Sequence, residues 1–203
     1  MDVHTFRGAL PDALTEALRQ EGPALGALPN HWLPATELSK PRSERALRTL
    51  AEACVAEAFD RVVAARLPAG WAVAEGSGVE WWCQHRGNEG MSFHIDKDEL
   101  LMKSDGSVST PILSSIIYLN QASGDDDAGA GAGSVEEGAE EAAPAPTLIC
   151  DQWWDTEQHC LTPAIPTRSA LIFPAFGRLA LFRGDLAHGV LQSGFQVSGD
   201  APC

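Results

Sequence analysis

The chain has 203 residues, 44% of them hydrophobic, and a formal net charge of −14. This length suits one well-filled globular domain. A pI near 4.7 disfavours nucleic acid as a partner, because phosphate-backbone binding needs a basic surface. Five cysteines without zinc-type spacing favour a reducing compartment, and no apolar run approaches membrane-spanning length. We therefore expect an intracellular, cytoplasmic protein without a membrane partner, while an organellar address stays open.

The N-terminal third is predicted to be helical. Apolar residues repeat at helical spacing over residues 11–21 and again over residues 43–67, in stretches rich in Ala and Glu. Between them, residues 22–41 are punctuated by prolines and are predicted to be irregular. We assign residues 1–70 to an N-terminal helical buttress.

Beyond residue 70 the composition becomes that of short strands, with aromatic and β-branched residues between turn signals. Helices followed by a succession of strands favour a mainly β fold, a sandwich or barrel supported by the helices. We assign this core to residues 71–203. The expected strands are residues 71–75, 79–84, 92–96, 114–120, 147–152, 169–173, 178–182 and 188–191.

A low-complexity segment interrupts the core at residues 121–146. It consists mostly of Gly, Ala, Asp, Glu and Pro, and Val135 is its only large apolar residue. Its seven acidic residues, with no Lys or Arg among them, supply half of the net charge of −14. Such a segment buries too little apolar surface to offset its ordering entropy, so we expect a disordered acidic insertion between two strands.

A candidate metal site comes from three residues on the expected strands. His94 and Asp96 are two positions apart, so their side chains share one face of an extended segment. His188 follows a later apolar strand and is the candidate third ligand. Two histidines and one carboxylate are the ligand set of non-haem ferrous iron sites, which keep open coordination positions.

These residues and their surroundings resemble the Fe(II)- and 2-oxoglutarate-dependent dioxygenases, particularly the prolyl-hydroxylase-like branch. The resemblance covers roughly residues 79–190. It rests on three features in order: His94-x-Asp96; a strand ending Tyr118-Leu119-Asn120; and the run from Gly177 to Phe182 that leads into His188-Gly189-Val190.

The resemblance implies a double-stranded β-helix, a cupin-like jelly roll, with Fe(II) bound by His94, Asp96 and His188. It implies 2-oxoglutarate and O₂ as cosubstrates, with ascorbate as a candidate further cofactor. The implied reaction hydroxylates a protein side chain or a small molecule and releases succinate and CO₂. Tyr118 and Gln84 match positions where relatives contact the cosubstrate.

The chain departs from the family after His188. Relatives carry an Arg or Lys that pairs with the far carboxylate of 2-oxoglutarate, whereas residues 191–203 contain no basic residue. Three explanations stay open. The chain is shortened before its last strand is complete, the protein does not use 2-oxoglutarate, or the anchor comes from elsewhere. The candidates for such an anchor are Lys97, Lys103, Arg178 and Arg183. The alternative function is therefore a non-catalytic, cupin-like metal-binding or interaction module that has lost the cosubstrate anchor.

The other polar and aromatic candidates have simpler interpretations. His4, His31, His85 and His159 lack a partner pattern and are interpreted as surface or structural residues. Asp98 is interpreted as a solvated loop charge beyond the strand. In the pairs Trp81-Trp82 and Trp153-Trp154, one ring should face inwards and the other outwards, for packing or to line a substrate mouth.

Overall fold

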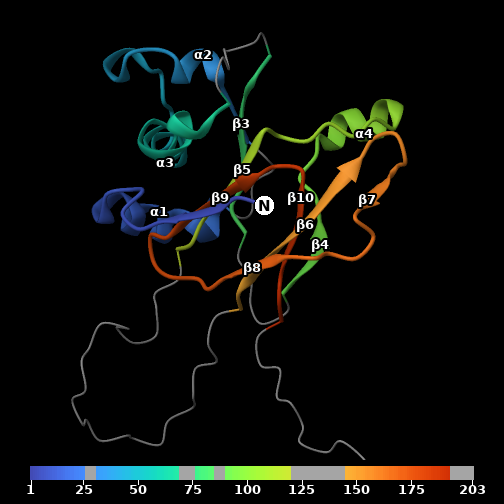
Figure 1. Ribbon diagram of the computed structural model, residues 1–203. Coiled ribbons are helices and arrows are strands. Elements are labelled where there is room, and N and C mark those ends of the chain that lie inside the picture. Colours follow the sequence, from blue (N-terminus) through green and yellow to red (C-terminus); the bar gives the residue numbers. More distant parts are fainter. Residues whose placement is uncertain (26–30, 69–75, 85–89, 120–144, 193–203) are drawn as a thin grey trace, which may run out of the picture.

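The computed structural model describes residues 1–25, 31–68, 76–84, 90–119 and 145–192 (Figure 1). In these ranges, two curled antiparallel sheets face each other, and a small two-stranded sheet lies beside the helices. The expectation of a mainly β fold with N-terminal helices is confirmed. No helix in the described part of the chain is both long and apolar enough to cross a membrane.

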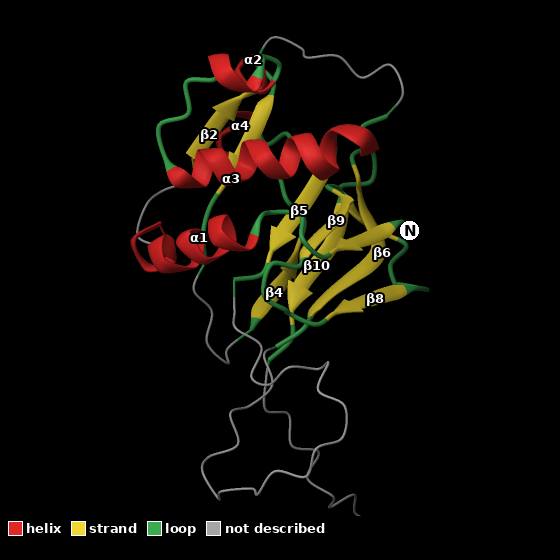
Figure 2. Cartoon of the chain, turned by 90° about the vertical axis from the view of Figure 1, so that its left-hand side faces the viewer, coloured by secondary structure: helices red, strands yellow, loops and turns green. Residues whose placement is uncertain are grey.

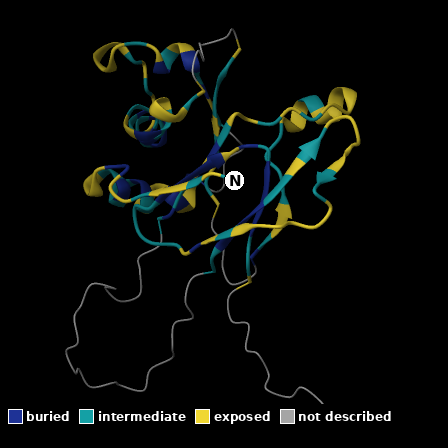
Figure 3. Cartoon of the chain, viewed as in Figure 1, coloured by how far each residue is buried: buried dark blue, intermediate teal, exposed yellow. Residues whose placement is uncertain are grey.

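The first sheet has the strand order β1-β9-β5. It consists of β1 (Val3–Phe6), β9 (Leu179–Arg183) and β5 (Leu113–Ile117). The central strand β9 is apolar and buried along residues 179–182, because both of its faces are covered (Figure 3). β1 was not predicted, and its pairing with β9 makes the N-terminal residues part of the sheet.

The second sheet carries the strands of the candidate metal site. Its order is β4-β10-β6-β7, and β8 pairs with the first half of β6. These strands are β4 (Met91–His94), β10 (Leu186–Val190), β6 (Thr147–Asp155), β7 (Cys160–Thr162) and β8 (Ser169–Ile172). β7 was not predicted, and β6 runs past its expected end at residue 152, where it pairs with β7.

Two helices cover the first sheet, and Figure 2 shows them on one side of the strands. They are α1 (Asp12–Leu25) and α3 (Leu50–Ala58). Leu179 and Leu181 of β9 pack against the helices, whereas Ala180 and Phe182 face the second sheet. This alternation follows from the period of two in a strand, and it gives the molecule one core on each side of β9.

Both helices differ in extent from the prediction. α1 continues beyond residue 21 to Leu25, because its last turn is buried against the core. α3 begins at Leu50 rather than at residue 43. The Thr49 hydroxyl caps this start by accepting a hydrogen bond from the Glu52 backbone N–H at 3.1 Å. It continues as a π-helical turn, Phe59–Val63, and a 3₁₀ turn, Ala64–Arg66.

The segment before α3 is held by an arginine rather than by helical hydrogen bonds. Arg45 donates to both carboxylate oxygens of Asp60 at 2.9 Å and to the carbonyl oxygens of Leu38 and Lys40. Its side chain is only 7% exposed. These bonds hold the chain extended beyond the 3₁₀ turn Arg42–Glu44, which explains the late start of α3.

A small sheet and two short helices complete the described structure. β2 (His31–Pro34) pairs with β3 (Gly78–Trp81), and α2 (Ala35–Leu38) follows β2 directly. The second short helix, α4 (Glu99–Asp105), begins three residues after the candidate ligand Asp96 and buries none of its residues. None of β2, α2 and α4 was predicted.

Asp98 is the N-cap of α4, not a simple loop charge. Its side chain accepts hydrogen bonds from the backbone N–H groups of Leu100 and Leu101, each at 2.9 Å. Two of the donors left free at the start of the helix are thereby satisfied. Asp98 is exposed and lies beyond β4, as expected, and its carboxylate has the additional role of capping α4.

Several predictions fall outside the described residues. They are the strand over residues 71–75, the domain boundary at residue 70, the acidic insertion except for residues 145–146, and the incomplete strand after residue 192.

Candidate metal site

The fold brings His94, Asp96 and His188 together. His94 ends β4 and pairs directly with His188 of β10, and their ring centroids are 4.4 Å apart. The Oδ1 atom of Asp96 lies 3.7 Å from the Nε2 atom of His94 and 3.6 Å from that of His188. Two ligands bonded to one metal ion at about 2.1 Å are at most about 4.2 Å apart, and both separations fall within this limit.

Backbone carbonyl groups orient both imidazole rings. The Nδ1 atom of His94 lies 2.9 Å from the carbonyl oxygen of Ser92, and that of His188 lies 2.9 Å from the carbonyl oxygen of Leu186. A carbonyl oxygen can only accept, so each Nδ1 carries the hydrogen and donates. In this tautomer the lone pair is on Nε2, the atom that faces Asp96.

Burial favours the neutral form of His188. Its side chain is 8% exposed, and burial lowers its pKa below the ordinary value, while the nearby Asp96 carboxylate opposes this shift. The lowered pKa favours the neutral ring that a metal ion needs. Phe182 packs edge-on against this ring, with centroids 5.0 Å apart. The site is more open on the side of His94, whose side chain is 30% exposed.

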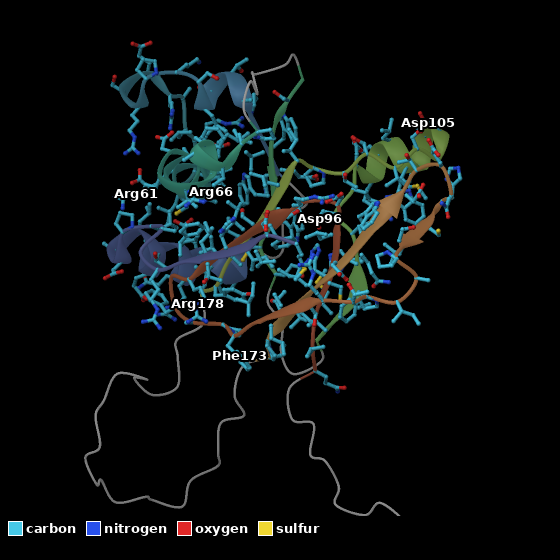
Figure 4. The ribbon with its side chains drawn as sticks, viewed as in Figure 1. Arg61, Arg66, Asp96, Asp105, Phe173 and Arg178 are labelled. Carbon is cyan, nitrogen blue, oxygen red and sulfur yellow. The ribbon has the colours of Figure 1, made fainter. Side chains whose placement is uncertain are left out.

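The second oxygen of the Asp96 carboxylate has a partner on the opposite sheet. The hydroxyl of Ser114, on β5, donates to Oδ2 of Asp96. In Figure 4, Asp96 lies near the middle of the molecule, away from the helices that carry Arg61 and Arg66. Ser114 was not among the residues predicted for the site. Its even spacing from Tyr118, the residue directly after β5, was a usable signal, because it places both side chains on the same face of an extended segment.

Gly189 allows the two ligand-bearing strands to approach each other. A Cβ atom at this position would lie 2.8 Å from the carbonyl oxygen of Met91 and 3.2 Å from the Cα atom of Phe93. Real Cβ atoms do not approach a backbone oxygen so closely. The glycine after His188 therefore follows from the close packing of β4 on β10.

Tyr118 is buried and reaches the sheet that carries His188. Its hydroxyl donates to Oγ1 of Thr147 at 2.8 Å, and Thr147 lies two residues before Ile149, the direct partner of His188 on β6. Burial raises the pKa of Tyr118, although the bond to Thr147 and the charge of Arg178 act in the opposite direction. The hydroxyl therefore remains a hydrogen-bond donor at neutral pH.

Gln84 is exposed and lies beyond β3, which pairs with β2 rather than with a strand of either large sheet. The fold does not place Gln84 on a strand of the His94, Asp96 and His188 site. Its proposed contact with the cosubstrate stays a prediction.

The four candidate anchors for a carboxylate have different surroundings. Arg183 forms an ion pair with Asp185, and Lys97 lies 3.5 Å from Glu99. Lys103 is exposed on α4. Arg178 donates to the carbonyl oxygen of Phe173 (Figure 4), and its charge acts on the Tyr118 hydroxyl. Among the four, Arg178 is thus the cation that acts electrostatically on Tyr118, one of the two predicted cosubstrate contacts.

The remaining histidines lie elsewhere in the fold. His4 and His159 are exposed, and His31 stacks on Trp81 with centroids 4.4 Å apart. His85 lies outside the described residues. In both tryptophan pairs one ring is exposed, Trp82 at 40% and Trp153 at 39%, while its neighbour is partly buried. One ring of each pair therefore faces outwards, as expected.

The donor set suits a first-row divalent metal ion. It combines two imidazole nitrogens with one carboxylate oxygen, on side chains close enough together that they could hold one ion. No protein-family model, curated protein or solved structure matches the chain.

Proposed function

We propose that the protein is an Fe(II)- and 2-oxoglutarate-dependent dioxygenase that hydroxylates a protein side chain or a small molecule. The observation that carries the proposal is the convergence of the His94 and His188 Nε2 atoms on Oδ1 of Asp96. His94 and His188 on neighbouring strands, with Asp96 just beyond β4, leave part of the coordination sphere open, as oxygen chemistry requires.

The strand connections support a jelly roll as the scaffold. From β4 onwards, the chain passes to the first sheet at β5, back to the second at β6, and again to the first at β9 before it returns at β10. Repeated crossing between two antiparallel sheets is typical of double-sheet jelly rolls. In the proposed fold, His94 and His188 meet because β4 and β10 are neighbours although they lie far apart in the chain.

The residues of the chain have separate roles in this proposal. His94, Asp96 and His188 hold the metal ion, and Phe182 shields the His188 ring from water. Bound iron with 2-oxoglutarate would supply the oxidising chemistry, with succinate and CO₂ as coproducts. The Tyr118 hydroxyl remains protonated, so in this proposal it would turn from Thr147 and donate its one hydrogen to a cosubstrate carboxylate, whose charge the positive charge of Arg178 complements.

The test combines metal binding with turnover. Anaerobic titration of the purified chain with Fe(II) should give one site, and 2-oxoglutarate with O₂ should then yield succinate. Mutation of a residue that only hydrogen-bonds to a metal ligand typically weakens metal binding by roughly ten- to a hundredfold. Removal of a ligand itself should weaken Fe(II) binding by more than this, in each of the variants His94→Ala, Asp96→Ala and His188→Ala. His159→Ala, which changes an exposed histidine, is the matched control. Unchanged Fe(II) binding in the three ligand variants would refute the site.

The second candidate is a metal-binding module without turnover. It is favoured by the pairing of two candidate anchors with acidic side chains, Arg183 with Asp185 and Lys97 with Glu99. Metal binding that depends on His94 and His188, without 2-oxoglutarate-stimulated O₂ uptake, would support this candidate against the dioxygenase.

A further inference from the structure

Ser114 connects the two sheets at the candidate metal site. It lies on β5 of the first sheet, is 7% exposed, and donates its hydroxyl hydrogen to Asp96. Asp96 lies two residues beyond the end of β4, so it is not held by the pairing of β4 with β10. A side-chain bond from the facing sheet is therefore a means of orienting this carboxylate.

The two oxygens of Asp96 have different partners. Oδ2 accepts from Ser114, whereas Oδ1 faces the Nε2 atoms of His188 and His94 at 3.6 and 3.7 Å. The bond to one oxygen fixes the rotation of the carboxylate and leaves the other oxygen free to bind a metal ion. A carboxylate without that bond is free to rotate, and it loses rotamer entropy when it binds.

The residue paired with Ser114 in the first sheet contacts the ligand His188. Ser114 pairs directly with Phe182 of β9, and the Phe182 ring packs edge-on against His188. Neighbouring positions on β5 and β9 thus contact two of the three ligands, although His188 belongs to the second sheet and Asp96 lies just beyond its strand β4. In metal sites of proteins, residues that hydrogen-bond to a ligand orient it, and the bond from Ser114 to Asp96 is of this kind.

We infer that Ser114 is a positioning residue, which orients Asp96 as a single-oxygen ligand in the metal site. The inference rests on the metal site of the proposed function, but it does not require turnover. It predicts that the Ser114 hydroxyl contributes to metal affinity through Asp96, beyond any effect on the stability of β5.

The test measures Co²⁺ binding by the full chain. Co²⁺ is a spectroscopic probe for such sites, and its visible absorption reports the coordination of the metal ion. Ser114→Ala removes one oxygen atom, and Ser114→Thr keeps the hydroxyl. Ser115→Ala is the matched control, because Ser115 is the next residue on β5 and is exposed. Circular dichroism and thermal unfolding of the metal-free chains establish that each variant is folded.

We expect Ser114→Ala to weaken Co²⁺ binding by about ten- to a hundredfold and to change the visible spectrum. We expect Ser114→Thr and Ser115→Ala to bind like the wild type. If a folded Ser114→Ala chain binds with wild-type affinity while Asp96→Ala loses binding, the role of Ser114 is refuted and the metal site stands. Equal weakening by Ser115→Ala, or a folded Ser114→Thr chain as weak as Ser114→Ala, refutes it as well. A wild-type chain that binds no Co²⁺ and no Fe(II) overturns the proposed function and this inference together.

Discussion

His94 and His188 are direct partners across the β4 and β10 pair, and their ring centroids lie 4.4 Å apart. A metal ion bound by both rings therefore joins a strand that starts at residue 91 to a strand near the end of the described chain. β4 pairs with no strand other than β10 in the described ranges, so such a link would stabilise the edge of the second sheet.

Metal binding should therefore raise the thermal stability of the protein. A ligand that binds only the folded state at a hundred times its Kd stabilises by about 2.7 kcal/mol. Differential scanning fluorimetry with and without Fe(II), under anaerobic conditions, measures the shift in Tm. His188→Ala should abolish the shift and His159→Ala should preserve it. An equal shift in both variants would mean that the metal ion binds elsewhere.

Gly189→Ala should separate the two ligand-bearing strands. The added Cβ would lie 2.8 Å from the Met91 carbonyl oxygen, and relieving this contact requires a movement of β4. We expect a loss of about 1–3 kcal/mol in the free energy of unfolding, typical of overpacking, together with weaker metal binding. Urea denaturation and metal titration measure the two effects.

Gly22→Ala is the control for this prediction. Gly22 lies within α1, and its Cβ would meet the Cys83 Sγ atom at 3.8 Å, an ordinary contact. Alanine has the higher helix propensity, by up to about 1 kcal/mol, so this variant should be neutral or more stable. Equal destabilisation by the two substitutions would contradict the steric argument.

Tyr118→Phe should affect stability and leave metal binding unchanged. It removes the donor to Thr147, whose hydroxyl is buried, at a cost of about 1–3 kcal/mol for an unsatisfied polar group. If Tyr118 also contacts the cosubstrate, the KM for 2-oxoglutarate should rise in the same variant. A loss of Fe(II) affinity would instead show that Tyr118 supports the ligands.

Cys54 should make the protein less stable at alkaline pH. Its thiol is buried, and burial raises its pKa from the ordinary value of 9.0 to about 11. Because the folded-state pKa is the higher one, this contribution to stability is fully present below pH 9 and is lost as the pH rises towards 11. Urea unfolding between pH 8 and 11 should show this loss in the wild type.

Cys54→Ala should reduce the alkaline loss, and Cys160→Ala, at an exposed cysteine, should not. In the folded wild type at pH 8, iodoacetamide should modify Cys160 much faster than Cys54, since the thiolate is the reactive form. Peptide mapping by mass spectrometry measures the two rates. Equal modification of both cysteines would contradict the buried, protonated state of Cys54.

Local sequence patterns were sufficient to predict the residues of the candidate metal site. The strand around His188 follows from the period of two in a strand, which is a local property of the sequence. The His94-x-Asp96 spacing identified both ligands, but Asp96 lies beyond the end of β4, so strand alternation does not set its orientation. Most of the later strands were predicted for the same reason, although β4 ends at His94 rather than at Asp96. Short elements without a clear pattern, such as β1, β7 and α4, were missed.

Local sequence patterns did not predict the contacts between segments that lie far apart in the chain. The bond from Ser114 to Asp96, the approach of β4 to Gly189 and the pairing of β1 with β9 each depend on the register of segments that are separated in the chain. The sequence by itself therefore determined which residues are suited to bind a metal ion. Tertiary packing decided how those residues are oriented, because side-chain orientation depends on strands that fold onto the site from elsewhere in the chain.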